Sequence, residues 1–297
     1  MKEAAFTAEK ELLAQAVREP GDRGEPPAEF ARTGRTRRGK SAASWQSRLY
    51  PVAAGLLFLL LWQLGALHGL LGLEPYQLPL PSDIGTSIRD NADVLWLYSL
   101  YTGAEIAGGC LLGSVLGLAA AVGASFLPRA GQAGISVLAA VSAVPIVALS
   151  PIASSWFGDG ILSRIAVVSV LTTATMAVSA YKGLTAIEPS YLELMSSAAA
   201  NRWQTLRKLR LPHALPDIFS ALKIGMSTGI IGAIVGEFFV ASRGLGYLLS
   251  DQIRLGNMPL AWACITIAAV LGIVLYTLIE GAERFAIPWH VSQRRSS

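Results

Sequence analysis

Two stretches of this sequence combine residue types and spacings that could serve a chemical function. The first, residues 34–41, reads Gly-Arg-Thr-Arg-Arg-Gly-Lys-Ser and fits the phosphate-loop pattern G-x-x-x-x-G-K-[ST] letter for letter. That pattern binds phosphate only between a β-strand and a helix whose N-terminus points at the ligand. Residues 29–33 do not form a buried-strand pattern, and an apolar run follows soon afterwards. We therefore interpret residues 34–41 as part of a basic tail and not as an ATP site.

The second stretch, residues 189–216, is a basic segment between two long apolar runs. Lys and Arg accumulate in the short cytoplasmic loops of membrane proteins, so this segment is expected in the cytoplasm. Its composition favours a short helix, which Pro212 and Pro216 are expected to end. The segment then forms a rigid knob able to pass force from a soluble partner into the membrane. Its basic residues are Arg202, Arg207, Lys208 and Arg210.

Other candidate reactive groups are sparse. The chain has no His–Glu zinc pattern, no Ser–His–Asp spacing and no evident carboxylate dyad, and Cys110 and Cys264 are interpreted as small apolar residues inside spans. We therefore predict no catalytic residue, no cofactor and no metal site. Glu105 is expected to be interfacial rather than paired or functional. Glu237 is a candidate for the translocation path, because an intramembrane carboxylate usually faces a wet cavity or a partner.

The composition indicates the elements that hold these residues. The chain has 297 residues, of which 53% are hydrophobic and only 15% charged, against about 25% charged in soluble domains. Apolar runs long enough to cross the hydrocarbon core recur along it. We predict an all-α polytopic membrane protein with about six transmembrane helices. The expected spans are 49–67, 97–126, 135–153, 162–181, 218–240 and 260–279.

The basic residues also predict the domain organisation and orientation. Residues 32–48 hold six basic and no acidic side chains directly before the first span, which places the N-terminus in the cytoplasm. We expect residues 1–47 to be a largely disordered cytoplasmic tail. Residues 48–285 then form the transmembrane domain, with its cytoplasmic loop at 182–217. Residues 286–297 form a cytoplasmic C-terminal tail.

Prolines and glycines mark special positions within the spans. Pro145 and Pro151 interrupt the third span, and broken helices often lie along substrate paths. We therefore name both as pathway candidates, with simple helix kinks as the alternative. Gly109, Gly113 and Gly117 recur every four residues, giving the second span a thin face suited to close helix packing.

The basic segment resembles the EAA loop of ABC importer permeases. The pattern is E-A-A, three residues, G, nine residues and I-x-L-P, and here it falls on 193–195, Ala199 and 209–212. The Glu and the final Leu-Pro are kept, whereas both alanines and the glycine are replaced. Further stretches are similar to the nitrate/sulfonate/taurine subfamily, so the resemblance covers residues 49–289. These stretches are 80–82, 144–145, 151–158, 181–183, 201–204, 211–216 and 236–238.

This resemblance implies a MetI-like permease subunit in the bacterial inner membrane. It implies a dimer of permeases. The implied partners are two cytoplasmic ATPase subunits and a periplasmic substrate-binding protein, and no nucleic acid is expected. The solute it implies is a small anion of the sulfonate, taurine or nitrate type. The helix over 190–203 is expected to insert into a cleft of the ATPase, and the replaced residues indicate a divergent ATPase. The implied coupling residues are Glu193, Leu194, Met195, Ala199, Arg202, Trp203, Leu211 and Pro212.

Two other classes of protein remain as alternatives. A secondary transporter driven by an ion gradient often shows inverted repeats and intramembrane carboxylates in proton relays. No convincing repeat is seen here, and Glu105 and Glu237 are expected near helix ends. A membrane enzyme or scaffold is the third class, for which the chain offers no catalytic constellation.

Overall fold

The computed structural model describes residues 42–288, and every regular element in that range is helical. The match to the phosphate-loop pattern and most of both tails lie outside the described residues. The chain divides into two compact units, 1–57 and 58–297. The elements are α2 (Ala42–Gln63), α3 (Ala66–Leu71), α4 (Pro81–Asp90), α5 (Ala92–Ser125), α6 (Pro128–Val141), α7 (Ile146–Phe157), α8 (Ile161–Thr185), α9 (Pro189–Ser197), α10 (Arg202–Thr205), the π-helical turn η2 (Leu206–Arg210), α11 (Leu211–Val240), α12 (Leu245–Leu255) and α13 (Met258–Ala286).

The membrane-spanning character of the fold follows from helix length and composition. Four helical stretches are long and apolar enough to cross a bilayer, namely α5, α8, the continuous run Arg202–Val240 and α13. The bent pair of α6 and α7 is a fifth candidate, and α2 contains a shorter apolar helix, Leu49–Gln63. Five of the six predicted spans fall on these five candidates, whereas the predicted span 49–67 matches only the shorter apolar helix and extends past its end at Gln63. The prediction of an all-helical membrane fold is confirmed.

The thin face of α5 packs on α8. A Cβ added at Gly113 would overlap the Thr172 hydroxyl and the Ser169 carbonyl, and one added at Gly109 would overlap Val168. Thr172 Oγ1 donates a hydrogen bond to the Gly109 carbonyl over 3.1 Å, which the close approach of the two backbones allows. The glycine row therefore serves packing within the chain.

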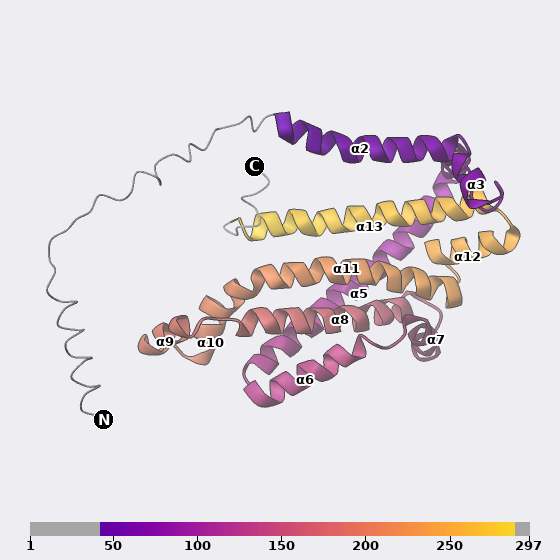
Figure 1. The fold of residues 1–297 in the computed structure, drawn as a ribbon. Coiled ribbons are helices and arrows are strands. Elements are labelled where there is room, and N and C mark those ends of the chain that lie inside the picture. The colour runs from indigo at the N-terminus through magenta and orange to yellow at the C-terminus, as the bar shows by residue number, and fades with distance from the viewer. Residues whose placement is uncertain (1–41, 289–297) are drawn as a thin grey trace, which may run out of the picture. The chain divides into compact units, whose positions relative to one another are not determined.

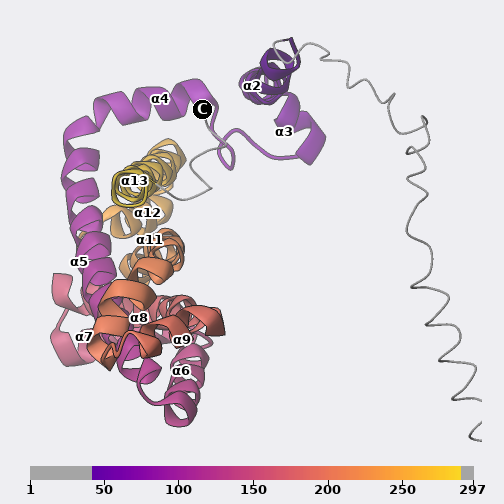
Figure 2. The same ribbon diagram turned by 90° about the vertical axis from the view of Figure 1, so that its left-hand side faces the viewer.

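The helices α8 and α11 lie side by side, and α5 crosses them (Figures 1 and 2). The glycines of α11 form two rows, Gly225 with Gly229 and Gly232 with Gly236, and residues of this chain pack against both rows. A Cβ at Gly229 would lie 3.0 Å from Cys110 Sγ, and one at Gly232 would lie 2.8 Å from Leu171 Cδ1. α11 thus carries contacts from both α5 and α8 along its length.

The third predicted span is broken, as its prolines indicate. The segments Arg129–Val141 and Ile146–Phe157 meet at 95°. Pro145 adopts an extended conformation immediately before α7, and Pro151 lies inside that helix. Pro145 therefore marks the break, whereas Pro151 does not interrupt the helix.

Two apolar clusters lie at opposite ends of the α8 and α11 pair. One joins the start of α5 to α12 and α13, and its buried side chains include Leu95, Leu245 and Leu260. The other joins α8 and α11 to the π-helical turn through Leu184, Leu206 and neighbouring residues.

Candidate functional site

The basic loop between α8 and α11 is a pair of short helices with closely defined ends. After α9, the Ala199 N–H donates to the Ser196 carbonyl over 2.9 Å and the Ala200 N–H donates to the Met195 carbonyl over 3.0 Å. These two bonds form the Schellman arrangement that satisfies carbonyls at a helix end. The next helix begins with a capping box, in which Asn201 and Gln204 exchange two hydrogen bonds of 2.8 Å.

Ala199 occupies the turn between these helices. Its φ of 51° makes it the one non-glycine residue with positive φ in the described part of the chain. Left-handed backbone of this kind favours glycine, because a Cβ crowds the following carbonyl oxygen. Ala199 is also the position where the resembled pattern has glycine. The backbone conformation therefore gives a physical reason for the glycine and supports the proposed register.

The structure corrects two predictions about this loop. A single helix over 190–203 is wrong, because α9 ends at Ser197 and α10 begins at Arg202. The prediction that Pro212 and Pro216 end the helix is also wrong, since both lie within α11. Pro212 lies inside the continuous run Arg202–Val240, directly after the π-helical turn, where the regular i→i−4 ladder is already interrupted.

The predicted coupling residues are mostly accessible on this loop. Leu194 is 65% exposed and Trp203 is 69% exposed. The Trp203 ring lies 5.4 Å from that of Phe126, measured between centroids, at the end of α5. The exposed members of the set are Glu193, Leu194, Ala199, Arg202, Trp203 and Pro212, while Met195 and Leu211 are half-buried.

Contacts with the membrane helices hold the loop in place. Arg210 Nη1 donates to the Ser125 carbonyl over 3.2 Å, which ties the loop to the C-terminal end of α5. Leu206 is buried in the apolar cluster between α8 and α11. Because η2 runs directly into α11, a displacement of α10 has a continuous helical path into the membrane domain.

A polar cluster lies at the opposite end of α8 and α11. Glu237 is fully buried and accepts hydrogen bonds from Thr102 Oγ1 over 2.6 Å and from the Gly246 N–H over 2.7 Å. The Leu245 N–H in turn donates to Thr102 Oγ1 over 2.9 Å. These are the first amides of α12, which have no partner within that helix. Glu237 and Thr102 therefore cap α12, and a negative group suits a helix N-terminus.

The surroundings of Glu105 differ from the prediction. Glu105 is only 5% exposed and lies inside α5 beside another carboxyl group, so the expectation that it is not paired is wrong. Its carboxyl group lies next to that of Glu237, so the structure forms a carboxyl pair that the sequence pattern did not reveal. The pair joins residues of α5 and α11 that are far apart in the sequence, and only the packed fold brings them together.

Arg164 is a buried charge that the sequence analysis missed. It lies in the first turn of α8, is 3% exposed, and donates through Nη1 to the Gly160 carbonyl over 3.3 Å and to Ser163 Oγ. The signal was present in the sequence, since an ionisable residue inside an apolar span is a candidate functional group by default.

The other pathway candidates lie on the bent pair. Pro145 and Pro151 are exposed, whereas Glu237 is buried. A Cβ at Gly236 would lie 3.0 Å from Ser150 Oγ. Pro151 directly follows Ser150, and Glu237 directly follows Gly236, so α7 and α11 meet beside both candidates. Their side chains nevertheless have different surroundings.

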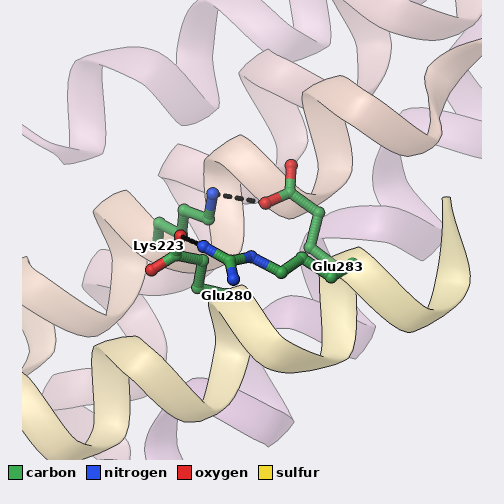
Figure 3. A network of polar contacts seen from close by, with 4 residues as sticks. Lys223, Glu280 and Glu283 are labelled. Carbon is green, nitrogen blue, oxygen red and sulfur yellow. Dashed lines mark hydrogen bonds and ion pairs between the residues drawn. The ribbon is translucent and has the colours of Figure 1, made fainter. Parts of the chain in front are cut away.

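Ionic contacts also join α11 to α13. Lys223 pairs with Glu283, and its Nζ lies 6.0 Å from the centroid of the Tyr276 ring. Next to this pair, Arg284 and Glu280 form a second one on the surface of α13 over 2.6 Å (Figure 3). Within residues 42–288, no group of three or more His, Cys, Asp or Glu side chains is placed to hold a metal ion.

A family model matches most of the membrane domain. Residues 113–287 match the model described as "Binding-protein-dependent transport system inner membrane component". The matched region begins within α5 and includes the basic loop, α11, α12 and α13.

Three curated relatives have transport names. The formylaminopyrimidine transport permease protein ThiX of Halalkalibacterium halodurans is 32% identical over 246 residues, covering 82% of this chain and 97% of the relative. The riboflavin transport system permease protein RibX of Chloroflexus aurantiacus is 30% identical over 250 residues, covering 84% and 92%. The taurine transport system permease protein TauC of Escherichia coli is 30% identical over 147 residues, covering 50% and 54%.

A solved structure shares the fold. An inward-facing structure of the MetNI methionine ABC transporter matches with a TM-score of 0.55 and 20% identity, covering 66% of this chain and 95% of that chain. The likeness extends over nearly all of the solved chain and supports the MetI-like arrangement of helices.

Proposed function

Because the chain belongs to the family of binding-protein-dependent transport system inner membrane components, the permease subunits of ABC importers, we propose that it forms the transmembrane path for a small anionic solute and is driven by a separate ATPase. The proposed coupling element is the loop around 190–212. The solute is of the sulfonate, taurine or nitrate type. The chain itself is a transport subunit.

The geometry of the basic loop is the observation that carries this proposal. Its two helices are held by a Schellman turn and a capping box, and Leu194 and Trp203 project from it largely exposed. Exposed apolar and aromatic side chains on a rigid support are suited to fill a groove on a partner. The partner's motion then reaches the membrane domain through the unbroken run from α10 into α11.

The partners and location follow from the same proposal. Two cytoplasmic ATPase subunits dock on the loops of two copies of this chain, and a periplasmic binding protein delivers the solute. The complex lies in the bacterial inner membrane, with both termini of the chain in the cytoplasm. The positive charge of the loop supports this orientation, because basic residues accumulate on the cytoplasmic side.

The identity of the solute is the most specific part of the proposal. The relatives' names refer to a formylaminopyrimidine, riboflavin and taurine, which differ in size and charge. The assignment is supported by the taurine relative, because taurine carries an anionic sulfonate group, and by the stretches similar to the nitrate/sulfonate/taurine subfamily. Thermal-shift screening of the cognate binding protein, followed by uptake assays with the assembled complex, tests it.

The energy source separates the proposed function from its main alternative. We expect uptake into cells or proteoliposomes to require ATP and to stop with vanadate, while a protonophore has little direct effect once ATP is supplied. Uptake that continues without ATP and collapses with the protonophore would instead indicate an ion-gradient-driven secondary transporter. Co-purification of an ATPase with the tagged chain is the companion measurement.

A further inference from the structure

A small polar pocket lies at the end of α8 and α11 opposite to the basic loop. Its volume is about 320 Å³, and it is lined by Tyr101, Glu105, Asp159, Arg164, Ser242 and Arg243 together with three apolar or glycine residues. At about 1.5 Å of rise per residue, Arg164 and Lys182 near the two ends of α8 are about 27 Å apart. That distance approaches the thickness of a bilayer core. If the loop is cytoplasmic, the pocket lies at the outer end of the path.

Two buried charged residues of this pocket have an atom without a hydrogen-bond partner among the residues that the structure describes. These atoms are Glu105 Oε2, on a side chain 5% exposed, and Arg164 Nη2, on a side chain 3% exposed. Neither residue is in a salt bridge within that part of the chain. Burying a polar atom without a hydrogen-bond partner is costly. An acceptor beside Arg164 and a donor beside Glu105 would satisfy both residues.

The remaining polar groups repeat this combination at the rim. Asp159 adds a second carboxyl group and Arg243 a second guanidinium group, and both residues are exposed. Arg243 Nη1 donates to Tyr101 Oη over 2.7 Å, with the guanidinium 5.4 Å from the ring centroid, so its position is fixed. The lining therefore presents two acidic and two basic groups around a small volume.

We propose that this pocket is a recognition site for a compact zwitterionic solute, whose anionic group contacts Arg164 and whose ammonium group contacts Glu105. The inference rests on the proposed permease function and narrows its solute class. A solute with only an anionic group would leave Glu105 Oε2 without a donor, and one with only a cationic group would leave Arg164 Nη2 without an acceptor. The volume lies at the small end of the range for ligand sites, which fits a compact molecule.

The turn between α11 and α12, which carries part of the pocket lining, is held in place by Glu237. Glu237 lies next to Glu105, but both of its oxygens accept hydrogen bonds, from Thr102 and from the start of α12. Glu237 therefore fixes the turn that carries Ser242 and Arg243, while Glu105 retains an oxygen for a ligand. The two neighbouring carboxyl groups have separate tasks, one structural and one for binding.

The selectivity of the unmodified complex is the first test. The purified permease with its ATPase is titrated calorimetrically with taurine and glycine, which are zwitterions. Ethanesulfonate, which lacks the ammonium group, and ethylammonium, which lacks the anionic group, are the matched probes. We expect at least one zwitterion to bind about tenfold or more tightly than either single-charge probe. If neither zwitterion binds better than ethanesulfonate and ethylammonium, the proposal is overturned.

Variants of the two buried residues give the second test. Glu105→Gln should remove the preference for the zwitterion over ethanesulfonate, and Arg164→Gln should weaken binding of both about tenfold or more. Glu283→Gln, at a partly buried carboxyl group on α13 remote from the pocket lining, should keep the preference. A Glu105→Gln complex that still prefers the zwitterion contradicts the proposal.

ATPase association separates this inference from the proposed function. Pocket variants that lose selectivity should still co-purify the ATPase, which also shows that they are assembled. If the unmodified chain associates with no ATPase, the proposed function fails. If it associates with one but shows no zwitterion preference, only the pocket assignment fails.

Discussion

The two ends of the α8 and α11 pair place their charges in opposite environments. At the loop end, Glu193 and Arg202 are exposed, and hydrogen bonds between neighbouring residues at the helix ends fix the shape. At the other end, Glu105, Arg164 and Glu237 are buried, and hydrogen bonds between residues far apart in the sequence help to fix the shape. Exposed groups on a rigid backbone suit a protein partner, whereas buried polar groups suit a small ligand or a structural network. The difference supports the proposed coupling role of one end and the proposed recognition role of the other.

The largest effect is expected where the two ends depend on the same packing. Gly113→Leu would force a side chain into Thr172 and the Ser169 carbonyl between α5 and α8, at a cost of about 3 kcal/mol or more. Both ends should then fail together, measured as loss of thermal stability and of ATPase association. Gly123→Leu is the matched control, because a Cβ there meets nothing within 4 Å. Equal tolerance of both substitutions would contradict the packing described for α5.

The next largest effect is expected only at the end opposite to the basic loop. Glu237→Ala removes the acceptor for Thr102 and for the first turn of α12, and buried donors left unpaired cost about 2 kcal/mol. The thermal midpoint of the complex should fall, while the loop keeps its ATPase. Glu280→Ala, at an exposed i,i+4 pair, should cost no more than about 0.5 kcal/mol. If the two variants are equally stable, Glu237 does not have the capping role described here.

A smaller effect is expected between α11 and α13. Lys223 and Glu283 are partly buried, whereas Arg284 and Glu280 are more exposed. A double-mutant cycle on the first pair should give a coupling energy of about 1 kcal/mol, and the same cycle on the second about 0.3 kcal/mol. A first cycle no larger than the second would show that burial does not strengthen this contact.

The smallest effect on stability is expected at Ala199, in the turn between α9 and α10. Ala199→Gly should stabilise the complex by about 0.5 kcal/mol, because glycine relieves the left-handed backbone at the cost of extra chain entropy in the unfolded state. Ala198→Gly, at a neighbouring position with negative φ, should destabilise it by a similar amount. Thermal melts of the two variants check the sign. A loss of stability with Ala199→Gly would contradict the strained turn.

The sequence predicted those features that depend on local composition. Apolar run length located the spans, the spacing of Gly109, Gly113 and Gly117 predicted close packing, and Pro145 predicted the broken helix. The loop was harder, because the pairing of Asn201 with Gln204 starts a new helix where composition alone favours a continuous one. Pro212 was misleading, because it follows a π-helical turn inside a continuous helical run and does not end that run.

The polar cluster depended on contacts that a single sequence does not display. Thr102 and Glu237 are 135 positions apart, and their hydrogen bond exists only when α5 packs against α11. Arg164 was detectable as a charge inside an apolar span. Its relation to Glu105 was not, because nothing in the spacing of two separate helices specifies which of their faces meet.

The most direct test of the account is ATPase binding by a permease altered only at Trp203. Trp203→Ala should weaken the association by about 2 kcal/mol, or roughly 30-fold, if this ring is a docking anchor. Trp96→Ala is the matched control, since Trp96 is 68% exposed and Trp203 69%, and Trp96 lies in the first turns of α5, far from the loop. We predict that Trp203→Ala inserts normally but loses its ATPase and its stimulation of ATP hydrolysis, while Trp96→Ala keeps both. Full ATPase association and uptake in both Trp203→Ala and Glu193→Lys would contradict the assignment of this loop as the coupling element.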